Sequence, residues 1–193
     1  MMKKTLCAAM LASIGLAAQA APQQYVFSYT GFDVIWKYNG VESARSFVPD
    51  AEVRGMFTGE DLDHDGVLRK DELSELVVTS FSPVNVAPGC YDSSGMFHCD
   101  MPYFTYVLGG ALSFGASTDY YHPEGAGAGY GVESGVEAYI WHSGYYGPSR
   151  ETSFNKYLWT PATSLSVTAV PEPAGYAMLG LGLLGIAALR RRA

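Results

Sequence analysis

The sequence predicts an all-β protein, a β-sandwich of about seven or eight short antiparallel strands. Aromatic and β-branched residues recur in short runs, and glycine- or proline-containing turns separate these runs. No long segment has the 3.6-residue spacing of apolar residues that is typical of an amphipathic helix. Many short strands with frequent turns favour a sandwich, and an open barrel is the nearest alternative.

The first strand is expected at residues 24–36, where Gly31 predicts a bulge or bend. The other strands are expected at 52–58, 77–81, 103–108, 111–114, 136–142, 153–159 and 164–170. Residues 125–131 (GAGAGYG) are predicted to form a flexible loop. They do not resemble a phosphate-binding loop, because no Lys-Ser or Lys-Thr follows them.

Residues 1–20 are predicted to be a secretory signal peptide. Two lysines precede an apolar core at 6–17, and the small residues at 18–20 form a cleavage site for signal peptidase before Ala21. A retained N-terminal anchor is the alternative. Cys7 lies inside the apolar core and would be removed with it.

Residues 21–169 are long enough for one domain with its own core. Without the five basic residues at the two ends and without Glu172, residues 21–170 hold 7 basic and 18 acidic residues, a net charge of −11. Such a surface repels nucleic acid and attracts cations. We therefore expect no nucleic-acid partner.

Residues 61–72 (DLDHDGVLRKDE) have the residue types and spacing of a twelve-residue EF-hand calcium loop. Carboxylates at positions 1, 3 and 5 converge on one ion, a glycine at position 6 permits the sharp turn, position 7 gives its backbone carbonyl, and the glutamate at position 12 binds with both oxygens. The segment resembles such a loop and predicts one Ca²⁺ ion. The predicted ligands are Asp61, Asp63, Asp65, Val67 and Glu72.

Two departures separate this loop from an EF-hand domain. Arg69 stands at position 9, where an oxygen ligand is usual, so its positive charge predicts weaker calcium binding. The entering segment 53–59 is expected to be a strand, a short helix is expected at 71–78, and no second loop is available for pairing. A structural calcium ion is the leading interpretation, and an acidic turn without metal is the alternative.

Cys90 and Cys99 are the two cysteines of the exported part, separated by a Ser-Ser-Gly turn. An even pair at short separation in an exported protein predicts a disulfide. A redox-active or nucleophilic cysteine is disfavoured, because the pair lacks Cys-x-x-Cys spacing.

The segment 120–146 is rich in aromatic residues. Exposed rings on a sheet suit sugar binding, whereas alternate Tyr and Trp residues also serve cross-strand packing. Glu133 and Glu137 are a candidate carboxylate pair for a polysaccharide hydrolase. No other catalytic motif is present, and the sequence predicts a non-enzymatic protein.

The segment 170–193 is predicted to be a sorting and tethering tail. It begins with Pro171-Glu172-Pro173, continues with the apolar run 174–189, and ends in three arginines. About 16 helical residues span roughly 24 Å, less than a hydrocarbon core of about 30 Å, so the helix would have to thin the inner membrane locally or extend its flanking side chains to the interface. The arginines favour the cytoplasmic side. A buried terminal core helix is the alternative.

This order of motif, glycine- and leucine-rich span and arginine cluster resembles the PEP-CTERM sorting signal. The resemblance covers only the last 24 residues and implies nothing about the activity of the domain. It implies recognition by an exosortase, cleavage near the Pro-Glu-Pro motif, and delivery to the cell surface or an extracellular polysaccharide matrix. The leading hypothesis is a non-enzymatic surface or matrix protein; the alternatives are a carbohydrate-binding module for extracellular polysaccharide and, third, a polysaccharide hydrolase.

Overall fold

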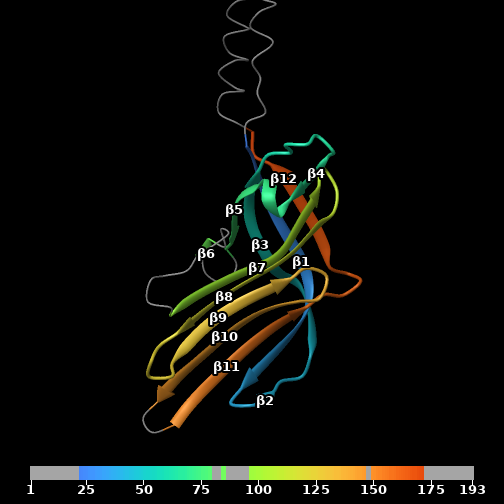
Figure 1. The fold of residues 1–193 in the computed structure, drawn as a ribbon. Helices are drawn as coiled ribbons and strands as arrows, with labels where there is room; N and C mark the ends of the chain where they lie inside the picture. The colour runs from blue at the N-terminus through green and yellow to red at the C-terminus, as the bar shows by residue number, and fades with distance from the viewer. Residues whose placement is uncertain (1–21, 80–83, 86–95, 147–148, 172–193) are drawn as a thin grey trace, which may run out of the picture.

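A computed structural model describes residues 22–79, 84–85, 96–146 and 149–171, which form one twelve-stranded antiparallel sheet (Figure 1). The strands are β1 (Gln23–Tyr38), β2 (Val41–Glu42), β3 (Ser46–Gly59), β4 (Val67–Arg69), β5 (Leu73–Val78), β6 (Val84–Asn85), β7 (Phe97–Val107), β8 (Leu112–Tyr121), β9 (Gly127–Glu133), β10 (Glu137–Tyr146), β11 (Ser149–Leu158) and β12 (Ser164–Ala169). A 3-10 helix, η2 (Lys70–Glu72), lies between β4 and β5.

The long strand β1 forms the spine of the sheet, whose order is β4-β7-β8-β9-β10-β11-β1-β3-β5-β6. Its first half pairs with β12 and its second half with β11, while β3 pairs along its other edge. The register shifts between Thr30 and Phe32, where Gly31 has φ +83°. The predicted irregularity at Gly31 is therefore confirmed, and the exchange of partners along β1 occurs there.

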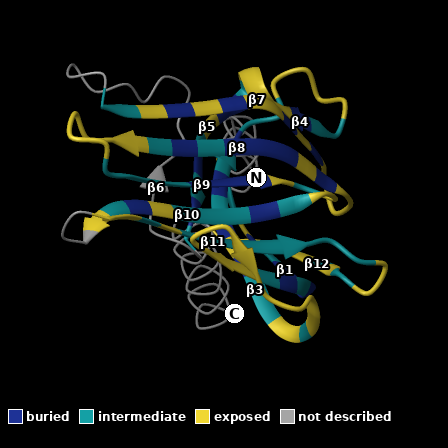
Figure 2. Cartoon of the chain, turned by 90° about the horizontal axis from the view of Figure 1, so that it is seen from below, coloured by how far each residue is buried: buried dark blue, intermediate teal, exposed yellow. Residues whose placement is uncertain are grey.

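The sheet curls so that strands far apart in its order face one another across the core. The ring centroids of Phe27 on β1 and Phe114 on β8 lie 5.3 Å apart. Phe57 on β3 lies 5.1 Å from Phe104 on β7, although six strand pairings separate β3 from β7 in the sheet. Burial alternates along the strands, as Figure 2 shows for β7. The result is a nearly closed, barrel-like sheet around an aromatic core.

The segment β4–η2–β5 bridges the two ends of the curled sheet. β4 pairs with β7 at one end, whereas β5 pairs with β3 near the other. Leu68 on β4 is 1% exposed, and Lys70 donates a hydrogen bond to the carbonyl of Met101 on β7. We call this segment, residues 67–78, the seam.

The all-β prediction is confirmed, but two separate packed sheets are not seen in the described residues. The single sheet also has more and longer strands than the predicted seven or eight. The helix expected at 71–78 is wrong: only η2 is helical, and Leu73–Val78 forms β5. Pairing with β3 explains the difference, because β-strand hydrogen bonds to a distant segment outweigh the weak local preference for helix.

The loop expected at 125–131 is also wrong in large part, because residues 127–133 form β9 between β8 and β10. The glycines lie beneath large rings of the next strand. A Cβ atom on Gly129 would come within 2.4 Å of the Trp141 Nε1 atom. Glycine therefore serves here to admit the neighbouring ring rather than to make the chain flexible.

Within residues 22–79, 84–85, 96–146 and 149–171, no helix is long and apolar enough to cross a membrane. The apolar run 174–189 and the signal peptide 1–20 lie outside the described residues, so both assignments remain predictions.

Candidate functional site

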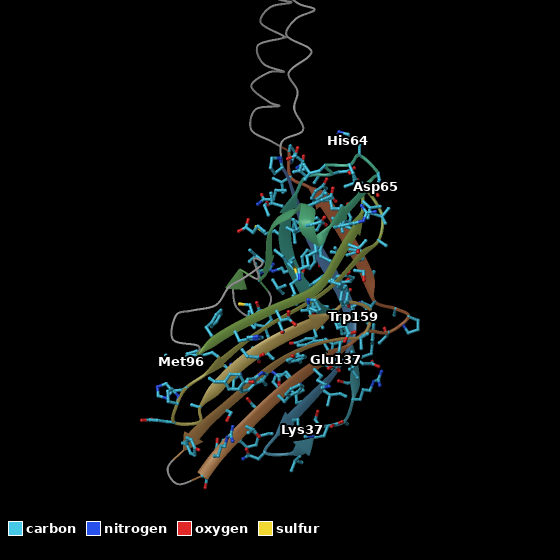
Figure 3. All side chains as sticks on the ribbon, in the orientation of Figure 1. Lys37, His64, Asp65, Met96, Glu137 and Trp159 are labelled. Atoms are coloured by element: carbon cyan, nitrogen blue, oxygen red, sulfur yellow. The ribbon has the colours of Figure 1, made fainter. Side chains whose placement is uncertain are left out.

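The loop that follows β3 brings three predicted calcium ligands together at one end of the molecule, where Figure 3 labels His64 and Asp65. Asp61, Asp63 and Asp65 each offer a carboxylate oxygen, and these oxygens lie within 4.8 Å of one another. Asp61 is half-buried, and the other two are exposed.

The backbone conformation of the loop explains this convergence. Gly66 has φ +82°, a left-handed conformation that glycine adopts without steric cost. The Asp61 carboxylate accepts hydrogen bonds from the backbone N–H groups of Asp65, at 3.1 Å, and Gly66, at 2.9 Å. These bonds curl the chain around the side chain of its first residue.

Glu72 closes the loop from the opposite side. Its Oε1 atom accepts a hydrogen bond from Leu62 N–H at 2.8 Å, and its Oε2 atom accepts one from Arg69 N–H at 3.0 Å. The carboxylate at position 12 thus contacts both ends of the loop. Its oxygens are bound to the backbone in this arrangement.

The side chain of Arg69 contacts three of the five predicted ligands. Its guanidinium lies 2.5 Å from the Asp65 carboxylate and 3.5 Å from the Asp63 carboxylate, and it donates to the Val67 carbonyl at 3.4 Å. The hydrogen bond from Arg69 holds the pKa of the Asp65 carboxyl below its ordinary value. The loop therefore carries its own cation next to the predicted metal ligands.

The predicted disulfide is only partly within the described residues. Cys99 lies on β7 and is 6% exposed, whereas Cys90 lies outside the described residues. The Cys90–Cys99 disulfide stays a prediction.

The aromatic segment divides between the core and the surface. Tyr130 is 4% exposed and belongs to the core, whereas Tyr121 and Tyr145 are more than half exposed. Trp141 is half-buried on the outer face, where its Nε1–H donates to Asp119 at 2.9 Å. The packing interpretation therefore applies to the inner residues, and the outer rings are available at the surface.

Glu133 and Glu137 face each other across β9 and β10. Both oxygens of Glu137 accept hydrogen bonds from Lys156 Nζ, at 3.0 and 2.8 Å. This ion pair gives Glu137 a partner in the sheet, and the hydrolase hypothesis gains no support from it.

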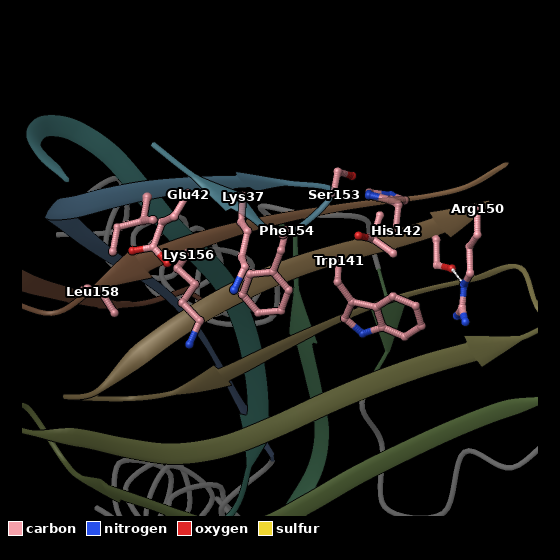
Figure 4. Close-up of a pocket in the computed structure, with 13 residues that line it drawn as sticks. Lys37, Glu42, Trp141, His142, Arg150, Ser153, Phe154, Lys156 and Leu158 are labelled. Atoms are coloured by element: carbon pink, nitrogen blue, oxygen red, sulfur yellow. Dashed lines mark hydrogen bonds between the residues drawn. The ribbon is translucent and has the colours of Figure 1, made fainter. Parts of the chain in front are cut away.

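A groove of about 660 Å³ lies on the outer face of β10 and β11 and extends to β1 and β2 (Figure 4). Its lining includes Lys37, Trp141, Arg150, Phe154 and Lys156. Of these residues, only Trp141 belongs to the aromatic segment 120–146. On β11, the groove residues Arg150, Phe154 and Lys156 are separated by even numbers of positions. Because alternate residues of a strand share one face, this spacing could have indicated that the three side chains lie together.

The first and last strands of the described chain lie side by side. The side chain of Gln23 donates to the Val170 carbonyl at 2.6 Å, and Val170 N–H donates to the Gln24 carbonyl at 2.8 Å. Only Val170 separates Pro171 from the end of β12, while Glu172 and Pro173 lie outside the described residues. The sorting motif therefore begins beside the start of β1.

Residues 169–192 match the model of the PEP-CTERM protein-sorting motif. This is a sorting signal. The PEP-CTERM motif implies export, membrane-associated sorting to the cell surface and processing by an exosortase. The match covers the tail alone, so it carries no information about the activity of the sheet domain. No curated protein and no solved structure matches the chain.

Proposed function

We propose that the protein is a non-enzymatic cell-surface or extracellular-matrix component whose sheet is held closed by one structural calcium ion in the loop 61–72. The observation that carries the proposal is the convergence of three aspartate oxygens within 4.8 Å, next to the seam. The ligands are Asp61, Asp63, Asp65, the Val67 carbonyl and Glu72.

The position of the loop gives the ion its role. The loop connects β3 with β4 and η2, and Glu60 N–H donates to the Glu72 carbonyl at 3.1 Å. An ion bound by residues on both sides of this contact stabilises the seam. Because a ligand that binds only the folded state adds to its stability, calcium raises the free energy of unfolding of the whole sheet.

Arg69 sets the affinity of the site. Its guanidinium pairs with Asp63 and Asp65, so it competes with calcium for both carboxylates. Calcium binding requires Arg69, whose side chain is 45% exposed, to turn outward. The cost lowers the affinity to a range suited to the millimolar calcium outside cells, since extracellular sites bind in about the 10⁻⁴–10⁻³ M range.

The exported form follows from the same proposal. Signal peptidase removes residues 1–20, and the helix 174–189 holds the chain in the inner membrane until the exosortase cuts near Pro171-Glu172-Pro173. A disulfide between Cys90 and Cys99 completes the domain, residues 21–169.

Thermal unfolding of the full chain in detergent micelles tests the calcium proposal. We expect 2 mM calcium to raise the midpoint by a few degrees relative to EDTA, since ligand at about 2–20 times its dissociation constant adds about 0.7–1.8 kcal/mol. Glu72→Gln should abolish this increment, and Arg69→Gln should enlarge it by removing the competing cation.

Glu124→Gln is the matched control, because it makes the same chemical change in the turn between β8 and β9. It should leave the calcium increment intact. Magnesium at 2 mM should give a smaller shift, because Mg²⁺ requires a tighter octahedral shell. An equal midpoint in calcium and in EDTA would contradict the proposal and mean that the loop is an acidic turn that binds no calcium.

A further inference from the structure

The groove on β1, β2, β10 and β11 concentrates positive charge on an otherwise acidic molecule. Residues 21–170 hold seven lysines and arginines against 18 carboxylates. Three of the seven, Lys37, Arg150 and Lys156, line this one groove, together with a single carboxylate, Glu42. The groove therefore differs in sign from the rest of the body.

Two of these cations have no carboxylate partner among the described residues. The ion pairs formed by Arg45, Arg54, Arg69 and Lys156 occupy four of the seven basic residues. Lys70 donates to a backbone carbonyl, and Arg150 donates through Nε to the Ser143 hydroxyl at 2.8 Å, which leaves its other donors unassigned. Lys37 and Arg150 are thus the cations available to an external anion.

Aromatic rings lie between the charged side chains. Figure 4 shows Phe154 and Trp141 on the same side of the strands as Lys37, Lys156 and Arg150. The Tyr139 and Phe154 rings stack with centroids 5.5 Å apart and planes 17° apart, and Tyr121 lies 5.5 Å from Trp141. The outer face therefore offers a row of rings on adjacent strands.

The pairing of the rings with charge points to one class of ligand. Flat rings contact the apolar faces of sugars, and the guanidinium and ammonium groups pair with carboxylates. Arg150 and Lys156 are six residues apart on β11, roughly 20 Å of strand, so an extended chain contacts both. A globular acidic partner would also cover the acidic surface beyond the groove and be repelled by it. A single narrow chain contacts the groove alone and avoids this repulsion.

We propose that this groove binds a linear anionic polysaccharide, with Lys37 and Arg150 pairing with its carboxylates and Trp141 and Phe154 contacting its sugar rings. The proposal goes beyond the surface role above and does not depend on calcium. Its test is carried out in EDTA, so that a failure of the calcium site and a failure of the groove are observed separately.

Affinity electrophoresis and titration calorimetry of the full chain in nonionic detergent, with alginate as the probe at low salt, test the proposal. We expect wild-type binding, at least a tenfold loss for Lys37→Gln/Arg150→Gln, and a gain for Glu42→Gln, which removes the one carboxylate of the groove. Trp141→Phe should weaken binding several-fold while it keeps a ring over β9.

Arg54→Gln is the matched control, because it removes the same charge from an exposed side chain on β3 outside the groove. It should change the affinity less than twofold. Dextran, a neutral chain, should bind far more weakly than alginate.

Three results would overturn the proposal. The first is an absence of alginate binding by a wild-type chain whose circular dichroism shows it folded. The second is an equal loss for Arg54→Gln, which would mean diffuse charge attraction. The third is evidence that the groove holds another occupant. Such evidence would be either equally tight binding of a single-stranded DNA oligonucleotide or a dimer of the chain that the Lys37→Gln/Arg150→Gln variant abolishes.

Discussion

At the scale of single residues, Arg69 places a positive charge inside the acidic loop. Three aspartates close together repel one another strongly, and such a cluster ordinarily needs a cation. The Arg69 guanidinium supplies one from within the loop, against Asp63 and Asp65. The residue that breaks the EF-hand pattern at position 9 therefore offsets part of the repulsion among the loop carboxylates.

Tyr130 gives the fold a sensitivity to alkaline pH. Burial raises the pKa of Tyr130 to about 12, and a hydrogen bond with Thr118 offsets part of this shift. In the unfolded chain a tyrosine ionises near pH 10. Stability is therefore complete below about pH 10 and falls as the pH rises to about 12, because only the unfolded chain readily releases the proton.

We expect the urea midpoint of the wild type to decrease from pH 9.5 to pH 11.5, and Tyr130→Phe to decrease less steeply. The slope with pH is the readout, since the loss of the hydroxyl also changes the value at pH 9.5. Tyr145→Phe, at a ring that is 55% exposed, should keep the wild-type slope. Equal slopes for wild type and Tyr130→Phe would contradict the assignment.

At the scale of elements, β9 shows how glycine positions a neighbouring strand. Trp141 of β10 lies over Gly127 and Gly129, and Tyr139 lies over Gly131. The small residues of one strand thus make room for the large residues of the next, as in the packing of glycine against aromatic rings in other sheets. The position of Trp141 in the groove depends on this arrangement.

Gly129→Ala should destabilise the protein by about 1–3 kcal/mol, the usual cost of overpacking. The added Cβ would lie 2.3 Å from the Asp119 carboxylate and 2.4 Å from Trp141 Nε1, so their hydrogen bond would have to shift. Urea unfolding measures the change.

Gly144→Ala on β10 is the control, because its Cβ would meet nothing within 4 Å. It should be neutral or stabilising by a few tenths of a kcal/mol, since alanine restricts the unfolded chain. Similar losses of stability for Gly129→Ala and Gly144→Ala would show that contact with Trp141 is not the cause of the destabilisation.

The elements that could be predicted are those whose signal is local. Aromatic and β-branched runs gave most of the long strands, and the spacing of Asp61, Asp63 and Asp65 predicted their convergence. β5 could not be predicted, since it depends on pairing with β3, and β9 could not, since the role of its glycines depends on Trp141. Lys37 and Arg150 line the same groove although more than a hundred residues separate them in the sequence, and no local sequence pattern predicts that they lie on one face.

At the scale of the whole molecule, the seam joins the two ends of the curled sheet. Leu68 of β4 packs against Gly59 of β3. A Cβ atom added to Gly59 would lie 3.4 Å from Leu68 Cδ1. Leu68 is itself buried in the core at 1% exposure. Closure therefore depends on a side chain as well as on the proposed ion.

Leu68→Ala should lower the free energy of unfolding by about 2–5 kcal/mol, the range for a buried leucine. Leu62→Ala, in the same loop but at a residue that is 62% exposed, should change it by less than about 0.5 kcal/mol. Guanidinium unfolding in EDTA measures both, so that calcium does not mask the difference. A small effect of Leu68→Ala would mean that the seam adds little to closure.

The pairing of β1 with β12 decides how the exported protein bears force. The tail leaves directly after β12, whereas Lys37 lies fourteen residues from Gln23, roughly 45 Å along β1 and toward the opposite end (Figure 3). A polysaccharide that pulls on the groove while the tail is anchored would therefore place tension along the axes of both strands. Tension in this direction loads the six residue pairs from Tyr25–Ala169 to Thr30–Ser164 together, in shear, instead of peeling them apart one at a time.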